Sequence, residues 1–164
     1  MKLSADGLER LLEPLLDSER IKLCGVRVSG HSSSPLIQLF IDLEEGNITV
    51  GACAEFSRQA QDLIDMQDWA PPNYRLMVSS PGIDWPLSQI WQFRKNVGRV
   101  VRCESDAGPF EGRLAGVTDE GKVRVVLAEG VVERTVAQLT GARVVLEAFG
   151  KKASKRKGNE TRSR

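Results

Sequence analysis

The first half of the chain contains two segments with the apolar spacing of amphipathic helices. Five leucines of the first segment recur at the i, i+3, i+4, i+7 and i+8 positions of one helical face: Leu8, Leu11, Leu12, Leu15 and Leu16. Ser4 is placed to cap this helix, and Pro14 inside it is expected to kink the helix or to end it early. The second segment is predicted to run from Thr49, its N-cap, to about Met66.

Three stretches around these helices alternate apolar and polar residues, as half-buried strands do. They are residues 21–28, with an unclear register at Gly25, then 36–43, and then 74–79. The short connection over 30–35 favours a hairpin of the first two strands. The order helix, strand, strand, helix, strand predicts an α+β layer in which two helices cover one face of a three-stranded sheet.

The segment Tyr74–Leu87 is predicted to be the joint between two domains. Its strand stops at Ser80, because Pro81 removes a hydrogen-bond donor and Gly82 permits a positive φ. The next proline suits the first turn of a helix, and we therefore expect a short helix over Pro86–Lys95.

The second half carries five short runs, most of them β-branched, with turn residues between them. These runs are residues 97–103, 110–117, 122–127, 131–136 and 143–146. Five strands at this spacing favour a small closed β-barrel, which leaves no exposed edges. We therefore expect an N-terminal α+β domain over 1–85, a C-terminal β-barrel domain over 86–149, and a disordered basic tail over 150–164.

Charge is unevenly distributed along a chain whose net charge is only +1. Residues 1–90 contain seven Lys or Arg against thirteen Asp or Glu, whereas residues 151–164 contain seven against one. This distribution argues against a uniform nucleic-acid-binding surface, and the acidic first half suits a basic protein partner. No run approaches the roughly 18 apolar residues of a membrane span. The N-terminus also lacks the apolar core of a signal peptide, so we expect a cytoplasmic protein.

The joint contains the polar residues that deserve a functional hypothesis. Ser79 and Ser80 would be nucleophiles if His31 acted as a base, but His31 is the only histidine and neither serine lies in a G-x-S-x-G motif. A structural role in the turn is favoured for both serines, with a direct partner contact as the alternative. Asp84 either caps the following helix or faces a basic partner, and its spacing from Pro86 favours the cap.

The three cysteines, Cys24, Cys53 and Cys103, are odd in number and far apart. Their spacing does not match a zinc site, so we expect three free thiols that behave as small buried hydrophobes. No metal-ligand cluster, phosphate-binding loop or acid–base pair is evident in the sequence. We therefore expect no catalytic residue, no metal and no cofactor.

Several motifs occur in a recognisable order along the chain. The most specific is Val78-Ser79-Ser80-Pro81-Gly82, followed by Asp84 and by Pro86-Leu87. The supporting matches are Phe40-Ile41-Asp42, Cys53–Arg58, Tyr74-Arg75-Leu76, Phe93, Gly98 and Phe110-Glu111-Gly112. Over about residues 1–149, this pattern resembles the RimP family of ribosome maturation factors.

The resemblance implies a non-enzymatic factor that binds the immature small (30S) ribosomal subunit and assists its assembly. It implies a barrel of the Sm-like or SH3-like kind, and contacts with the basic ribosomal protein S-twelve and nearby 16S rRNA. We expect the partner-binding residues to be Ser79, Ser80, Gly82, Asp84 and Trp85, and the protein to be a monomer. The family usually has Arg at position 85 and Glu at position 77, where this chain has Trp85 and Met77. A contact through that Arg cation cannot be made here.

Alternatives remain for the tail, for the tryptophans and for the function as a whole. The basic tail residues are either only solvated or contact rRNA phosphates: Lys151, Lys152, Lys155, Arg156 and Lys157. Trp85 and Trp91 are expected to pack between the domains rather than to stack on RNA, and Asp42 has either a turn role or a surface role. The alternative function is an RNA-binding module of another process that uses the barrel and the tail, although the barrel strands lack an RNP-like aromatic motif.

Overall fold

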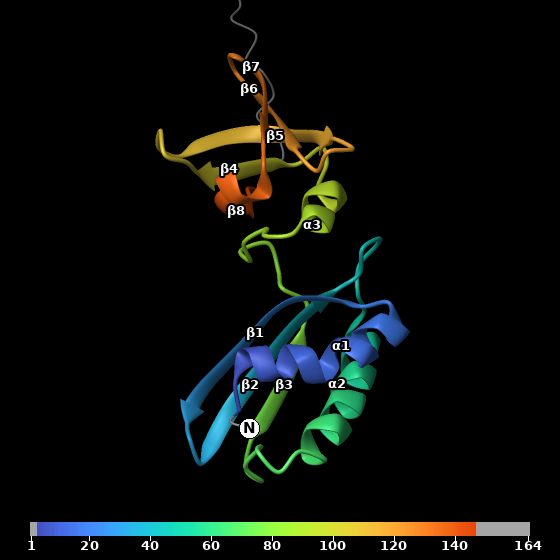
Figure 1. The fold of residues 1–164 in the computed structure, drawn as a ribbon. Helices are drawn as coiled ribbons and strands as arrows, with labels where there is room; N and C mark the ends of the chain where they lie inside the picture. The colour runs from blue at the N-terminus through green and yellow to red at the C-terminus, as the bar shows by residue number, and fades with distance from the viewer. Residues whose placement is uncertain (1–2, 147–164) are drawn as a thin grey trace, which may run out of the picture.

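A computed structural model describes residues 3–146 of the chain (Figure 1). Its first helix, α1, spans Ala5–Glu19 and is capped as predicted, because Ser4 Oγ accepts a hydrogen bond from the Gly7 N–H at 3.2 Å. The helix continues through Pro14, so the expected early end is wrong. Buried leucines on both sides of this proline pack against the sheet and hold the helix together although one backbone hydrogen bond is missing.

The first two strands form the predicted antiparallel hairpin. Strand β1 spans Lys22–His31 and β2 spans Ser34–Asp42. The register shifts between Leu23 and Gly25, which is where the alternation in the sequence is unclear. A bulge of this kind places an extra residue, Cys24, in β1 and bends the strand locally.

The second helix and third strand complete the N-terminal layer. Helix α2 spans Val50–Asp65, and its predicted cap is confirmed, since Thr49 Oγ1 accepts from the Ala52 N–H at 3.0 Å. Strand β3 spans Arg75–Ser79 and pairs with β2 in parallel, which gives the sheet order β1-β2-β3.

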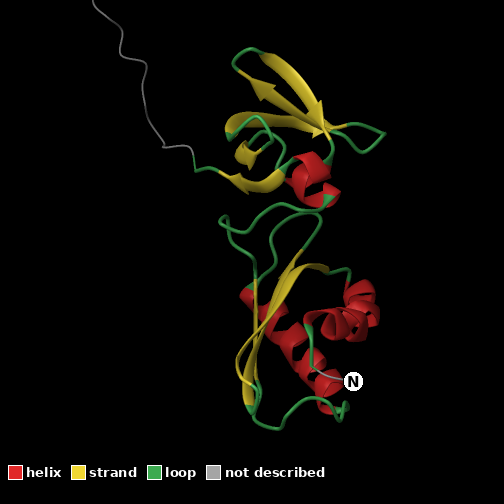
Figure 2. Ribbon diagram, turned by 60° about the vertical axis from the view of Figure 1, so that its left-hand side comes forward, coloured by secondary structure: helices red, strands yellow, loops and turns green. Residues whose placement is uncertain are grey.

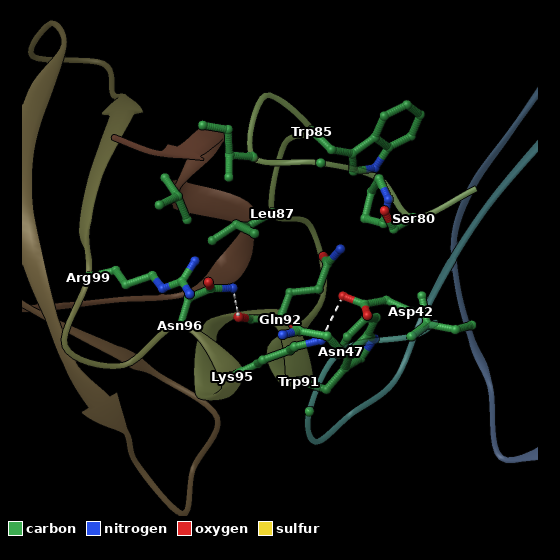
Figure 3. Close-up of a pocket in the computed structure, with 16 residues that line it drawn as sticks. Asp42, Asn47, Ser80, Trp85, Leu87, Trp91, Gln92, Lys95, Asn96 and Arg99 are labelled. Carbon is green, nitrogen blue, oxygen red and sulfur yellow. Dashed lines mark hydrogen bonds and ion pairs between the residues drawn. The ribbon is translucent and has the colours of Figure 1, made fainter. Parts of the chain in front are cut away.

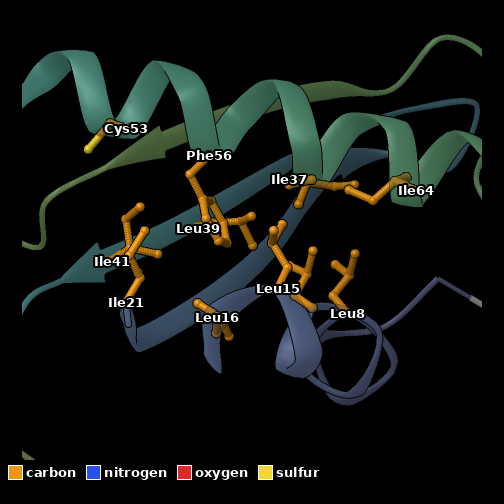
Figure 4. Close-up of a cluster of buried hydrophobic side chains, with 12 residues drawn as sticks. Leu8, Leu15, Leu16, Ile21, Ile37, Leu39, Ile41, Cys53, Phe56 and Ile64 are labelled. Atoms are coloured by element: carbon orange, nitrogen blue, oxygen red, sulfur yellow. The ribbon is translucent and has the colours of Figure 1, made fainter. Parts of the chain in front are cut away.

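Both helices cover the same face of this sheet, as predicted, and the opposite face carries no helix of residues 3–146 (Figures 1 and 2). The buried side chains between helices and sheet form one hydrophobic core (Figure 4). They are Leu8, Leu12, Leu15, Leu16, Ile21, Ile37, Leu39, Ile41, Cys53, Phe56, Ala60 and Ile64. In β2 the alternate residues Ile37, Leu39 and Ile41 are therefore the ones that meet the core.

The second half contains a five-stranded antiparallel sheet with its own core. The strands are β4 (Val100–Glu104), β5 (Phe110–Val117), β6 (Val123–Leu127), β7 (Gly130–Arg134) and β8 (Thr140–Val144), and the short 3₁₀ helix η1 (Val136–Gln138) precedes β8. The sheet order is β7-β6-β5-β4-β8, and within residues 3–146 no strand pairing joins β7 to β8. The five predicted strands are confirmed, whereas closure into a small barrel is not.

The short helix α3 begins later than the sequence suggests. It spans Ile90–Lys95 instead of starting at Pro86. The Oε1 atom of Gln92, inside the helix, accepts a hydrogen bond from the Gln89 N–H at 2.9 Å and so satisfies an amide at the helix start. The predicted cap by Asp84 is therefore wrong, because this carboxylate lies several residues before the first turn.

Gly112 in β5 provides a test of packing in the second sheet. A Cβ built on Gly112 would lie 2.4 Å from Val125 Cγ1 and 2.8 Å from the Val126 carbonyl oxygen. Gly112→Ala should therefore lower the free energy of unfolding by about 1–3 kcal/mol, because the core must shift to accept the methyl group. The matched control is Gly116→Ala in the same strand, where nothing lies within 4 Å of the added Cβ. Urea denaturation measures the free energy of unfolding of both variants. An equal decrease in the two would contradict the close packing at Gly112.

Candidate functional site

The two halves of the chain line a cavity of about 440 Å³ (Figure 3). Its walls come from the end of β2, the loop after β2, the segment that follows β3, and α3. Polar side chains from both halves reach it, among them Asn47, Asn96 and Arg99. At the joint predicted from the sequence, the two halves therefore line an open cavity with both polar and apolar walls.

An ion pair connects the two halves beside this cavity. Lys95 Nζ donates to Asp42 Oδ2 at 2.7 Å and to the Leu43 carbonyl at 2.9 Å (Figure 3). Asp42 Oδ1 also accepts from the Leu43 N–H at 2.9 Å. The Lys95 and Asp42 side chains are only 17% and 19% exposed, so water screens their attraction weakly. Asp42 thus combines a local role at the end of β2 with a link to α3.

Gln92 is a buried polar residue at the same contact, with 3% of its surface exposed. In addition to accepting from the Gln89 N–H, its Oε1 atom accepts from the Ser88 N–H at 2.7 Å, and its side chain lies close enough to the Cys24 thiol to lower the pKa of that thiol. Burial raises the pKa of the Cys24 thiol to about 11, and the negative charge of Asp42 acts in the same direction. The thiol is therefore neutral at physiological pH. All three cysteines are free and buried, as predicted.

The indole of Trp85 packs on the uncovered face of the first sheet. A Cβ at Gly25 would lie only 2.3 Å from Trp85 Cζ2, so the ring occupies the space that a side chain at this position would fill. The rings of Trp85 and Phe40 have centroids 4.3 Å apart and planes inclined by 32°. The guanidinium carbon of Arg27 lies over the indole, 4.7 Å from the ring centroid. Trp85 is thus held by a glycine, an aromatic ring and a cation.

Gln89 and Leu87 supply two further connections. Gln89 Nε2 donates to the Leu23 carbonyl of β1 at 3.2 Å, and Gln89 Oε1 accepts from Trp91 Nε1 at 2.7 Å. The Leu87 N–H donates to the Ala142 carbonyl of β8 at 2.7 Å. The segment between β3 and α3 is therefore tied to both sheets.

A protein-family model matches the N-terminal half of the chain. The RimP N-terminal domain matches residues 11–84, which include most of α1 and all of β1, β2, α2 and β3. The chain belongs to the RimP family. RimP is a family of ribosome maturation factors, so this membership indicates a role in ribosome biogenesis and association with the ribosome. The match ends one residue before Trp85, at the joint itself.

The structure brings together three of the five residues proposed for partner binding. Ser80, Gly82 and Trp85 line the cavity next to the RimP N-terminal domain. Ser79 instead ends β3 and pairs with β2, and Asp84 is exposed. Partner binding by all five stays a prediction. The tail residues proposed to contact rRNA phosphates lie outside the described residues: Lys151, Lys152, Lys155, Arg156 and Lys157.

The catalytic arrangement considered for the serines does not occur. His31 lies at the β1–β2 turn, with its Nδ1 atom 2.8 Å from Ser33 Oγ. Because β3 runs parallel to β2, Ser79 and Ser80 lie at the opposite end of the sheet. Within residues 3–146, no group of three or more His, Cys, Asp or Glu side chains could hold a metal ion. No helix in the same range is long and apolar enough to cross a membrane.

Three residues of this site were missed by the sequence analysis. Lys95 and Gln92 lie on either side of the motif residue Phe93 but are not motif residues themselves, and only the contact of Lys95 with β2 and the proximity of Gln92 to Cys24 of β1 show their role. Gly25 had a signal, since a glycine inside a strand pattern indicates a bulge or a close approach. The residue that approaches Gly25 is Trp85, which lies sixty positions later in the chain. The sequence alone does not pair these two residues.

The close approach of Trp85 to Gly25 leads to a double-mutant test. Gly25→Ala should lower the free energy of unfolding by about 1–3 kcal/mol in the native chain, because the methyl group displaces the indole. The same substitution should cost much less in a Trp85→Ala background, where the space is empty. Denaturant unfolding of the four proteins measures the coupling. The control is Gly51→Ala, because a Cβ built on Gly51 would lie 3.9 Å from its nearest neighbour. If the effects of Gly25→Ala and Trp85→Ala on the free energy of unfolding were additive, the packing of the indole against Gly25 would be contradicted.

The ion pair between the halves leads to a second test. Lys95→Met keeps most of the stem but leaves Asp42 partly buried without its cation, so it should cost about 1–3 kcal/mol of unfolding free energy. The matched surface variant is Arg102→Met, since the Arg102–Glu111 pair is 65% and 44% exposed. It should change the stability by less than about 0.5 kcal/mol. Chemical denaturation measures the free energy of unfolding of both variants. Similar decreases would show that the Lys95–Asp42 pair contributes no more to stability than an exposed ion pair.

Proposed function

We propose that this chain is a non-enzymatic ribosome maturation factor that binds the immature small (30S) ribosomal subunit and assists its assembly. Membership of the RimP family through residues 11–84 is the observation that carries the proposal. In this proposal the factor acts by holding a local arrangement of protein and rRNA while assembly proceeds. It works in the cytoplasm, as a monomer, without a metal or cofactor.

The proposed partners are ribosomal protein S-twelve and nearby 16S rRNA. The charge of the helical layer supports a basic protein partner, because α1 and α2 together carry eight Asp or Glu against two Lys or Arg. The proposed contacts at the joint are Ser79, Ser80, Gly82, Asp84 and Trp85, of which three line the cavity. The basic tail residues Lys151 to Lys157 are proposed to contact rRNA phosphates.

The proposal also divides the chain into an N-terminal domain over 1–85, a C-terminal domain over 86–149 and a basic tail over 150–164. Two separate hydrophobic cores, one beneath each sheet, support the first two units. The second unit is proposed to be a small barrel of the Sm-like or SH3-like kind. Its five antiparallel strands and the short 3₁₀ helix before the last strand support that assignment.

Sedimentation of cell extracts tests the proposed function. The tagged full chain should co-migrate with free small subunits or their precursors on a sucrose gradient, and not with translating ribosomes. Absence of the protein from both small-subunit fractions would overturn the proposal.

Deletion of residues 151–164 separates the proposal from its alternative, an RNA-binding module of another process. The tail, with seven basic residues against one acidic residue, is the observation that favours that alternative. If the described part of the chain recognises the subunit, the deletion should weaken co-migration only partly, with a shallower salt dependence. Complete loss of co-migration would favour the alternative.

A further inference from the structure

The two faces of the N-terminal layer carry opposite charge. The helical face is acidic, as described above, whereas the strands behind it contain Lys22, Arg27 and Arg75 against a single acid, Asp42. That carboxylate is already paired with Lys95 of α3. The sheet face that the helices leave uncovered (Figure 2) is therefore the basic side of a layer whose overall charge is negative.

The strand register shows which residues share this face. Arg27, Gln38 and Met77 lie side by side across the three strands, and Leu36 and Arg75 form the adjacent row. Phe40 lies in the row on the other side, next to Trp85. We call this surface the open sheet face: Arg27, Leu36, Gln38, Phe40, Arg75 and Met77. Met77 is 47% exposed, and both arginines are exposed.

The two arginines of the open sheet face are available to a ligand. Neither forms an ion pair with a carboxylate in the described part of the chain. Arg27 is also positioned, because its guanidinium lies 4.7 Å from the Trp85 ring centroid and 5.5 Å from the Phe40 centroid. A guanidinium held over aromatic rings loses less side-chain freedom when it binds a phosphate or stacks on a base.

We propose that the open sheet face binds a single-stranded segment of RNA. A base stacks on the Arg27 guanidinium, which itself lies over Trp85, while Arg27 and Arg75 neutralise backbone phosphates. Gln38, whose Nε2 donates to Met77 Sδ at 3.7 Å, offers its Oε1 atom as an acceptor to a base edge. Exposed sheets that combine flat side chains with cations suit unpaired bases better than they suit a duplex. The inference rests on the proposed function, in that the natural strand is ribosomal RNA.

Fluorescence anisotropy tests this site with the full-length chain and a fluorescein-labelled oligouridine of about 12 nucleotides. Arg27→Gln/Arg75→Gln should weaken binding about tenfold or more at low salt. The plot of log affinity against log salt should become shallower by about 1.4, because two phosphate contacts are lost. Arg27→Lys should leave that slope unchanged and weaken binding about threefold, since the charge stays but the plane that stacks is lost.

The matched control removes the same charge from the opposite face. Arg10→Gln/Arg58→Gln on α1 and α2 should leave the affinity for RNA within about twofold. Equal weakening by the two double variants, or no weakening by Arg27→Gln/Arg75→Gln, would overturn the proposal, as would failure of the native chain to bind the oligonucleotide. Thermal unfolding by circular dichroism checks that each variant is folded.

Sedimentation with small subunits separates this proposal from the proposed function. If Arg27→Gln/Arg75→Gln binds the oligonucleotide normally but no longer co-migrates with subunits, the open sheet face contacts a protein, and the RNA site is wrong while the proposed function stands. If the native chain binds the oligonucleotide through these arginines but never co-migrates with subunits, the RNA site stands and the proposed function fails.

Discussion

The contact between Trp85 and Gly25 is the tightest constraint at the joint. The indole fills the position that any other side chain at residue 25 would occupy, and Trp85 lies six residues after the end of β3 at Ser79. The direction in which the chain continues into the second half therefore depends on the absence of a side chain at Gly25 of β1. The bulge between Leu23 and Gly25 affects two contacts at this joint. It accompanies the glycine that receives Trp85, and it adds Cys24, whose thiol lies near Gln92 of α3.

The polar contacts at the joint select one arrangement more than they add stability. A partly buried ion pair gains little net free energy over an apolar pair, because both charges lose hydration. Displacing α3 would nevertheless leave Asp42 and the Leu43 carbonyl without the Lys95 ammonium group, and would separate Gln89 from Leu23. Alternative orientations of the two sheets therefore cost several hydrogen bonds at once.

The parts of the structure that the sequence predicts are those in which neighbours in the chain decide the outcome. The spacing of the leucines in α1 and the cap of α2 by Thr49 are local signals, and both are confirmed. The predicted start of α3 was wrong because the Leu87 N–H, in the expected first turn, donates to the Ala142 carbonyl of β8, and the helix begins only after Gln89, whose N–H donates to Gln92 from within the helix. At the cavity, Ser80 and Trp85 had been predicted as site residues from the motif in the joint, Tyr74–Leu87.

Lys95 and Arg27 were not found, because each acquires its role from a residue on another element. Nothing near Lys95 in the sequence indicates Asp42, and nothing near Arg27 indicates Trp85. Pairings of this kind between distant segments leave no periodic pattern in the sequence. Closure of the second sheet is a similar case: strand number and spacing favour a barrel, but the pairing of β7 with β8 depends on curvature that turn residues alone do not determine.

The position of Trp85 joins the geometry of the molecule to its surface. One residue of the joint both orients the second half, through Gly25, and supports Arg27 on the open sheet face. A ligand that displaced Arg27 from the indole would remove one of the contacts that hold Trp85, whereas a ligand that stacked on Arg27 in place would strengthen the arrangement. Ligand binding on the open sheet face would therefore be coupled through Trp85 to the orientation of the second sheet. By reciprocity, a partner that fixed the second half would favour binding on the open sheet face.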